Sequence, residues 1–177
     1  ADSNAAFSID FGSISGVTTF RSILSTAKIS TSSMGATDIE VVGNGGVSGA
    51  AADLTVGYGT AATSSTVTYK DGVDAGDLTV TGTKLTSQTI KSTGAQNDID
   101  AITLSSATTA TTIDAATKFV TSGALDLGAT TKLTITGAGA VDIDAATLDT
   151  TTDVVDASAA TGDVDISTGA VSANTAA

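Results

Sequence analysis

The chain has 177 residues, a formal net charge of −12, no proline and no cysteine. An acidic chain with only 7 basic residues is repelled by nucleic acid and by anionic lipid, so we expect neither as a partner. The absence of cysteine excludes disulfide scaffolds, thiol nucleophiles and Cys-based zinc sites. The absence of proline favours continuous β-ladders, because proline has no N–H group to donate to them.

The composition of the core is unusual. Apolar residues make up 41% of the sequence, but aromatic residues make up only 3%, and aromatic side chains supply large buried areas in ordinary cores. A core of Ala, Val, Ile, Leu and Thr is typical of a thin, repetitive architecture. No apolar run reaches the length of a membrane span, and no signal peptide is visible at Ala1, so we expect a mature chain or a fragment.

The N-terminal part predicts short strands at uneven spacing. Residues Phe7–Phe11 alternate apolar and polar side chains, which predicts a first strand. The segment Val17–Ile29 fits both helical and strand spacing, so it predicts either a short helix or a coil of a solenoid. Further strands are predicted at Ile39–Val42, Leu54–Tyr58, Ser65–Tyr69 and Leu78–Thr81.

From Leu85 onward the sequence is uniform and repetitive. Short apolar–x–apolar strands begin roughly every eight to ten residues, and each is too small to bury its own apolar side without stacking on its neighbours. We place a soft boundary near Gly72–Gly76, between an N-terminal strand-rich segment (1–75) and a repetitive segment (76–177); one continuous domain is the alternative. The apolar pairs are Leu125/Leu127, Leu133/Ile135, Val141/Ile143, Val154/Val155 and Val164/Ile166.

Internal similarity indicates a coiled repeat. The phrase IDAAT occurs at 113–117 and 143–147, and the related IDAIT at 99–103. A coil of roughly 22 to 24 residues would stack like side chains in columns inside a solenoid. The two expected columns are Ile90, Ile113, Ile135 and Leu104, Leu127, Leu148.

The predicted fold is therefore all-β. We expect a parallel β-solenoid, of the β-helix or β-roll kind, in the C-terminal part, and a less regular N-terminal part. One β-sandwich or tandem β-sandwiches are the alternative, because short strands joined by tight turns fit that architecture as well.

Aspartates gather in a Gly-rich turn that is a candidate metal site. The segment KDGVDAGD places Asp71, Asp74 and Asp77 on one loop, where their carboxylates repel one another unless solvent or a cation intervenes. Ca²⁺, a hard cation that prefers oxygen ligands, is the expected metal. The alternative is an ordinary turn in which Asp side chains bond nearby backbone N–H groups.

A second acidic turn follows it. The segment GAQNDIDA (94–101) resembles the Gly/Asp nonapeptide of RTX β-rolls, in which turn carbonyls and Asp side chains of adjacent coils bind Ca²⁺. The resemblance implies Ca²⁺ ligands at Asn97, Asp98 and Asp100. The double glycine of that family and its tandem copies are missing here.

Longer phrases resemble one family. ISGVTTF (14–20), the repeated IDAAT, and VDASAATGDVDIST (155–168) are similar to bacterial S-layer proteins and related giant RTX-type surface proteins. The resemblance implies a strand-rich or solenoid surface protein that assembles into a lattice or fibre and depends on Ca²⁺.

The sequence has no histidine, no cysteine and no recognisable nucleophile elbow or phosphate loop, so we predict that the protein is not an enzyme. We predict a structural, self-assembling extracellular protein, a subunit or segment of a bacterial surface layer or filament. Its expected partners are further copies of itself and cell-surface polysaccharide.

The alternative function is an adhesin-type binding module for glycan, host surface or ice. It predicts either a flat threonine face or a small cluster that includes Tyr58 and Tyr69. Thr-x-Thr alternation occurs at Thr66–Tyr69, Leu78–Thr83 and Leu133–Gly137. Its uneven spacing favours an ordinary hydrated outer face instead.

Overall fold

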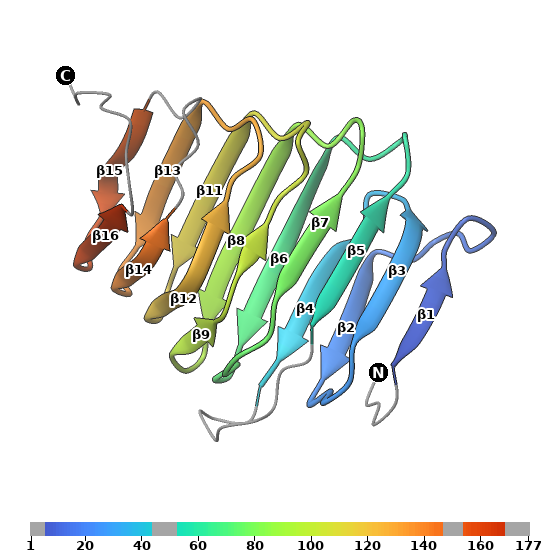
Figure 1. Ribbon diagram of the computed structural model, residues 1–177, viewed down its shortest axis with the longest axis horizontal. Helices are drawn as coiled ribbons and strands as arrows, with labels where there is room; N and C mark the ends of the chain where they lie inside the picture. The colour runs from blue at the N-terminus through green and yellow to red at the C-terminus, as the bar shows by residue number, and fades with distance from the viewer. Residues whose placement is uncertain (1–5, 44–52, 147–153, 169–177) are drawn as a thin grey trace.

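The computed structural model describes residues 6–43, 53–146 and 154–168, which form a parallel β-solenoid of about 6 turns without any helix (Figure 1). The strands are β1 (Phe7–Asp10), β2 (Thr19–Ile23), β3 (Ile29–Met34), β4 (Asp38–Val42), β5 (Leu54–Tyr58), β6 (Ser64–Lys70), β7 (Leu78–Thr81), β8 (Ser87–Thr93), β9 (Asn97–Ile99), β10 (Ile102–Thr103), β11 (Ala110–Ala115), β12 (Phe119–Asp126), β13 (Lys132–Gly137), β14 (Val141–Ala146), β15 (Val154–Ala160) and β16 (Val164–Thr168).

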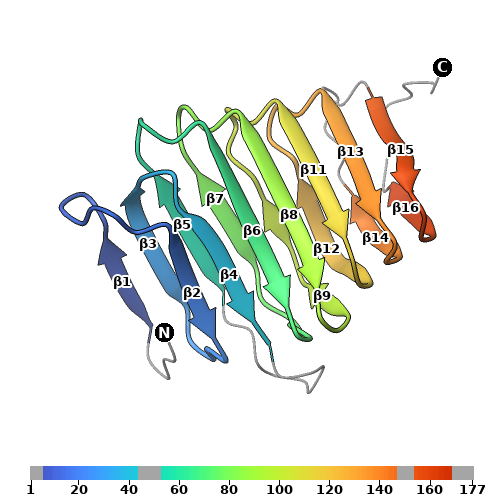
Figure 2. The same ribbon diagram turned by 180° about the vertical axis from the view of Figure 1, so that it is seen from behind.

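The strands are divided between two sheets that face each other across a thin core. Figure 1 shows the first sheet in front, in the order β1-β3-β5-β7-β10-β12-β14-β16, with β9 pairing β12. Figure 2 shows the molecule from behind, with the second sheet in front; its order is β15-β13-β11-β8-β6-β4-β2. The ladders in both sheets are parallel. The parallel pairing confirms the predicted solenoid and excludes the β-sandwich.

The predicted isoleucine column is confirmed. Ile90, Ile113 and Ile135 are register partners in β8, β11 and β13, and all three are fully buried. Leu104 and Leu127 are also buried on neighbouring coils, whose β10 and β12 pair in register. Leu148 lies outside the described residues. Like side chains therefore pack on like ones inside, which keeps each coil the same width as the next.

The predicted strands of the N-terminal part agree with the structure. The bounds of β5 and β7 are those predicted, β1 and β4 differ by one residue at one end, and β6 is longer by one residue at each end. Between Val17 and Ile29 the structure has β2, and the helix alternative is wrong. In β2, Phe20 and Ser22 are buried while the residues beside them are exposed, which is the two-residue period of a strand.

Both sheets continue through the predicted boundary near Gly72–Gly76, because β5 pairs β7 and β6 pairs β8. At the corners, successive coils approach one another closely. Gly137 has a φ of 104°, and a Cβ at this position would collide with the carbonyl oxygen of Ala115 on the preceding coil. Glycine there combines the left-handed backbone with the close approach that stacking needs.

Candidate functional site

The structure brings the two predicted acidic turns together on adjacent coils. Asp74 forms an isolated parallel bridge with Asp98. These two residues, with Val73 and Gln96, line a shallow cavity of about 290 Å³. One carboxylate from each turn therefore borders the same opening.

Both carboxylates of this pair are partly buried, and Asp98 is the one with a buried oxygen atom, Oδ1, that lacks a hydrogen-bond partner among the described residues. Burial raises the pKa of Asp98, and the negative charges of Asp74 and Asp100 raise it further, while Lys118 acts in the opposite direction. The ionised form of Asp98 is therefore disfavoured, which is the electrostatic condition that a bound cation relieves.

Asn97 lies beside this pair but is bonded within the protein. It is fully buried, and its Oδ1 accepts a hydrogen bond from the backbone N–H of Val73 at 2.9 Å. Its Nδ2 donates to the hydroxyl of Ser92 at 2.8 Å and to the carbonyl of Ala95 at 2.9 Å. These bonds satisfy both ends of the amide and join neighbouring coils.

The other predicted ligands are spread along the turns. Asp71 is partly buried with a φ of 61°, and Asp77 is exposed just before β7. Asp100 is exposed after β9, and its Oδ2 accepts a hydrogen bond from the N–H of Gly76 at 3.1 Å. Within the described residues no three acidic side chains converge closely enough to hold a metal ion. The Ca²⁺ site stays a prediction.

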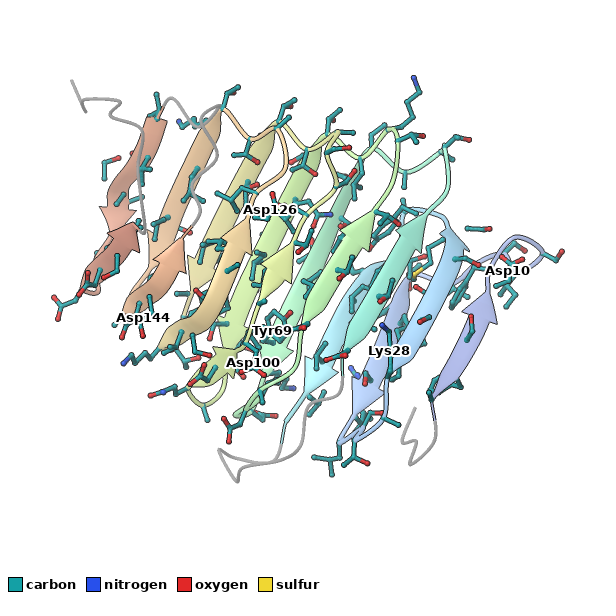
Figure 3. All side chains as sticks on the ribbon, in the orientation of Figure 1. Asp10, Lys28, Tyr69, Asp100, Asp126 and Asp144 are labelled. Atoms are coloured by element: carbon teal, nitrogen blue, oxygen red, sulfur yellow. The ribbon has the colours of Figure 1, made fainter. Side chains whose placement is uncertain are left out.

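The acidic turns continue into an acidic face on the first sheet. Asp98, Val120, Asp142 and Asp165 are register partners on four successive coils. Lys118 relieves part of this charge, because its Nζ lies 3.3 Å from Oδ2 of Asp142. Figure 3 labels Asp126 and Asp144 on the sheet that faces the viewer, and Asp100 in the turn after β9. This column was not predicted from the sequence, because its residues are aligned by the pairing register of the strands, which the sequence does not show.

The second sheet carries a regular column of threonines. Thr66, Thr89, Thr112 and Thr134 are register partners in β6, β8, β11 and β13. Neighbouring parallel strands are about 4.8 Å apart, so the threonines repeat at that interval. The Thr-x-Thr pairs are unevenly spaced along the sequence, but the register of these four coils aligns one threonine from each.

A second threonine row follows the corner before these strands. The hydroxyl groups of Thr86, Thr109 and Thr131 each donate to the backbone carbonyl of the threonine one coil earlier, at 3.3 to 3.4 Å. The same backbone positions are also linked by N–H to carbonyl bonds. These hydroxyls therefore help to hold successive coils at a fixed spacing.

The two tyrosines belong to the core and do not form an exposed cluster. Tyr58 is 7% exposed, and its hydroxyl donates to the carbonyl of Thr37 at 2.8 Å. Burial raises the pKa of Tyr58 to about 12. Tyr69 is 3% exposed, and its ring packs against that of Phe119 with the centroids 6.3 Å apart. The aromatic form of the adhesin prediction is therefore wrong.

The exposed large apolar side chains of the described residues lie at the two ends of the solenoid. Ile14, Ile23 and Leu24 belong to the first turn and are 39–49% exposed. Val154 and Val155 begin β15, in the last turn, and are 49% and 41% exposed. Figure 1 shows β1 and β2 at one end of the stack and β15 and β16 at the other.

No family model, curated protein or solved structure matches this chain. In the part of the chain that the structure describes, no helix is long and apolar enough to cross a membrane.

Proposed function

We propose that this chain is a structural, self-assembling extracellular protein, a subunit or segment of a bacterial surface layer or filament. The observation that supports this most directly is the location of the exposed large apolar side chains at the two ends of the stack. Exposed apolar side chains that gather in one place mark surfaces that bind a partner. A partner that covers both ends of one solenoid is a further copy of the same solenoid.

The two broad faces support the same function by remaining polar. The second sheet presents its threonine column, and the first sheet presents the acidic face that includes Asp142 and Asp165. Polar faces of this kind stay in water, and a net charge of −12 opposes side-by-side association of the solenoids. Growth along the solenoid axis is therefore favoured over lateral clumping.

The extracellular, bacterial setting is supported by the sequence phrases similar to S-layer and RTX-type surface proteins, at 14–20 and 155–168. Such a chain would contact cell-surface polysaccharide through its hydroxyl-rich faces. We also propose that Ca²⁺ stabilises the assembly at the acidic turns. Asp74 and Asp98 would supply two carboxylates, and backbone carbonyls, water or an adjacent copy would supply the remaining oxygen ligands.

The proposal is tested on the purified chain by sedimentation and negative-stain electron microscopy over a range of protein concentrations. Each sample is measured with Ca²⁺ and with a chelator. We expect the average mass to rise with concentration and the images to show rods one solenoid wide. A chain that stays monomeric at high concentration in both conditions would contradict the proposed function.

A binding module is the second candidate, and the threonine column favours it. Thr66, Thr89, Thr112 and Thr134 form a straight row of hydroxyl and methyl groups on a flat sheet. This candidate predicts that the chain binds immobilised surface polysaccharide or slows the growth of ice, and that Thr89→Lys removes the activity. The matched control is Thr79→Lys on the first sheet, where Thr55, Thr79 and Thr103 form a shorter column.

A further inference from the structure

We infer that copies of this chain stack head to tail, with β15 of one copy pairing in parallel with β2 of the next. This inference rests on the proposed assembly and adds its polarity and register. The second sheet ends at β2 on one side and at β15 on the other, and among the described residues neither strand has a partner on its outer side. Both are therefore edge strands, which can template a further strand.

The direction of the strands selects the polarity of stacking. Every strand of the second sheet runs the same way, and Figure 2 shows β2 and β15 pointing in the same direction at opposite ends. A copy moved along the solenoid axis therefore presents β2 to β15 in parallel. A two-fold axis that joined like ends would instead bring the strands together antiparallel, and the coil would not continue across the junction.

The register of this junction follows from the columns inside the molecule. The column that contains Phe20 continues through Ile39, Val67, Ile90, Ile113 and Ile135. Thr134 pairs with Asp156, and a β-bulge follows, so that Ala157 and Ser158 together lie opposite Ile135. Of these two residues, Ala157 packs against the core. Stacking would set Ala157 of one copy against Phe20 of the next. A small side chain then meets a large one, which is the alternation that fills a core without overlap.

The exposed apolar side chains lie beside this junction. Ile23 and Leu24 follow the Phe20 position on one end, and Val154 and Val155 precede the Ala157 position on the other. Val155 lies in register with the buried Leu133, so it faces the core at the open end, and head-to-tail stacking would cover it. Because the two ends differ, the contact is heterologous and does not close, which generates a filament and not a dimer.

The test uses two variants, each of which blocks a different end of the solenoid. Ile23→Lys with Leu24→Lys places charge at the β2 edge, and Val154→Lys with Val155→Lys places it at the β15 edge, which discourages strand addition there. We expect each variant alone to sediment as a monomer. An equimolar mixture should form a 1:1 dimer, because each variant keeps the end that the other has lost. Dimer formation in the mixture also shows that both variants are folded.

A disulfide test fixes the register and does not depend on the blocked variants. The chain has no cysteine of its own, so introduced thiols report a single contact. Thr19→Cys with Asp156→Cys should cross-link copies into a ladder under oxidation, since paired strands bring Cα atoms within disulfide range. The matched control, Thr19→Cys with Thr134→Cys, places the second thiol one coil further in, beyond that range, and should stay uncross-linked.

The outcomes separate this inference from the function on which it rests. If the unmodified chain stays monomeric, the proposed assembly fails and the inference fails with it. If the unmodified chain assembles but either blocked variant dimerises alone, like ends meet and head-to-tail stacking is wrong. Assembly of the unmodified chain together with a monomeric mixture, or equal cross-linking of the Thr134→Cys control, would also overturn it.

Discussion

The side-chain oxygen of Asn97 accepts a hydrogen bond from the backbone N–H of Val73, 2.9 Å away on the preceding coil. The amide nitrogen of the same side chain bonds Ser92 and Ala95 within its own turn. One buried side chain thus satisfies backbone groups in two coils at the corner where the acidic turns meet. Buried polar groups of this kind cost little while paired and much when a partner is removed.

We therefore expect Asn97→Leu to destabilise the chain strongly. The substitution leaves the buried N–H of Val73 without its partner, at a cost of about 1 to 3 kcal/mol. Chemical denaturation monitored by circular dichroism measures the loss. The control is Gln96→Leu at the exposed neighbouring position, and an equal loss in the control would show that the Asn97 bonds contribute nothing special.

Substitutions of core residues should lower the free energy of unfolding in proportion to the burial of the residue that is replaced. Ile113 is fully buried between Ile90 and Ile135, so Ile113→Ala should cost about 2 to 5 kcal/mol and Ile113→Val about 0.5 to 1.5 kcal/mol. Val155 begins the last coil and is 41% exposed, so Val155→Ala should cost less than about 1 kcal/mol. Denaturant midpoints at a concentration below assembly provide the comparison. A larger loss at Val155 than at Ile113 would contradict the observed core.

The corner at Gly137 should tolerate no side chain. Gly137→Ala requires a left-handed backbone at φ 104° and pushes a methyl group into the carbonyl of Ala115, so we expect a loss well above about 1 kcal/mol. Gly35→Ala is the matched control, because a Cβ at Gly35 meets nothing within 4 Å. Thermal unfolding should show a clear fall in melting temperature for Gly137→Ala and little change for Gly35→Ala.

The repeat could be predicted from the sequence because Ile90, Ile113 and Ile135 recur at the coil length, and stacked coils place residues with that spacing in register. The sequence could not distinguish a helix from a strand at Phe20, since the residues of 17–29 fit both helical and strand spacing. The threonine column at Thr66 and Thr89 was missed for a different reason. A side chain's outward neighbours depend on the coil length, and that length changes along the chain.

The functional surfaces were harder to predict than the core. Asn97 was expected as a Ca²⁺ ligand on the resemblance of its turn, whereas the structure shows its amide bonded to Val73 and Ser92. Val155 lies in register with the buried Leu133, so its exposure depends on which coil lies outermost, and no pattern within β15 marks it as an edge strand. Local sequence patterns therefore predict which residues form a column. The order in which the coils stack determines which residues of a column are exposed to solvent.

Ca²⁺ should stabilise the chain through Asp74 and Asp98. A cation between these carboxylates offsets their repulsion and the burial of the Asp98 oxygen, so added Ca²⁺ should raise the melting temperature and chelator should lower it. Asp98→Asn should remove the response to Ca²⁺. Asp126→Asn, which removes a carboxylate from an exposed position of β12, should keep it. An unchanged melting temperature with millimolar Ca²⁺ would rule out the predicted metal site.

Acid should weaken the last coil through Asp156. The hydroxyl and backbone N–H of Ser158 donate to Asp156 Oδ1 at 2.7 and 3.1 Å, and Lys132 Nζ lies 3.1 Å from Asp156 Oδ2; together these lower the pKa of Asp156 to about 2. The unfolded chain therefore binds a proton more readily than the folded chain. The contribution of Asp156 to stability is complete above the ordinary pKa of 3.8 and is lost as the pH falls through about 2.

Asp156→Asn should therefore lower the melting temperature at neutral pH, and its difference from the unmodified chain should vanish by about pH 2. Ser158→Ala keeps the carboxylate but removes its hydroxyl donor, the largest cause of the shift, so the pKa of Asp156 should rise toward 3.8. Carboxyl titration by NMR measures that rise directly. Added salt should weaken only the part of the pKa lowering that comes from Lys132, because the Lys132–Asp156 ion pair is exposed to solvent. A difference between Asp156→Asn and the unmodified chain that stays constant from neutral pH to pH 2 would contradict this account.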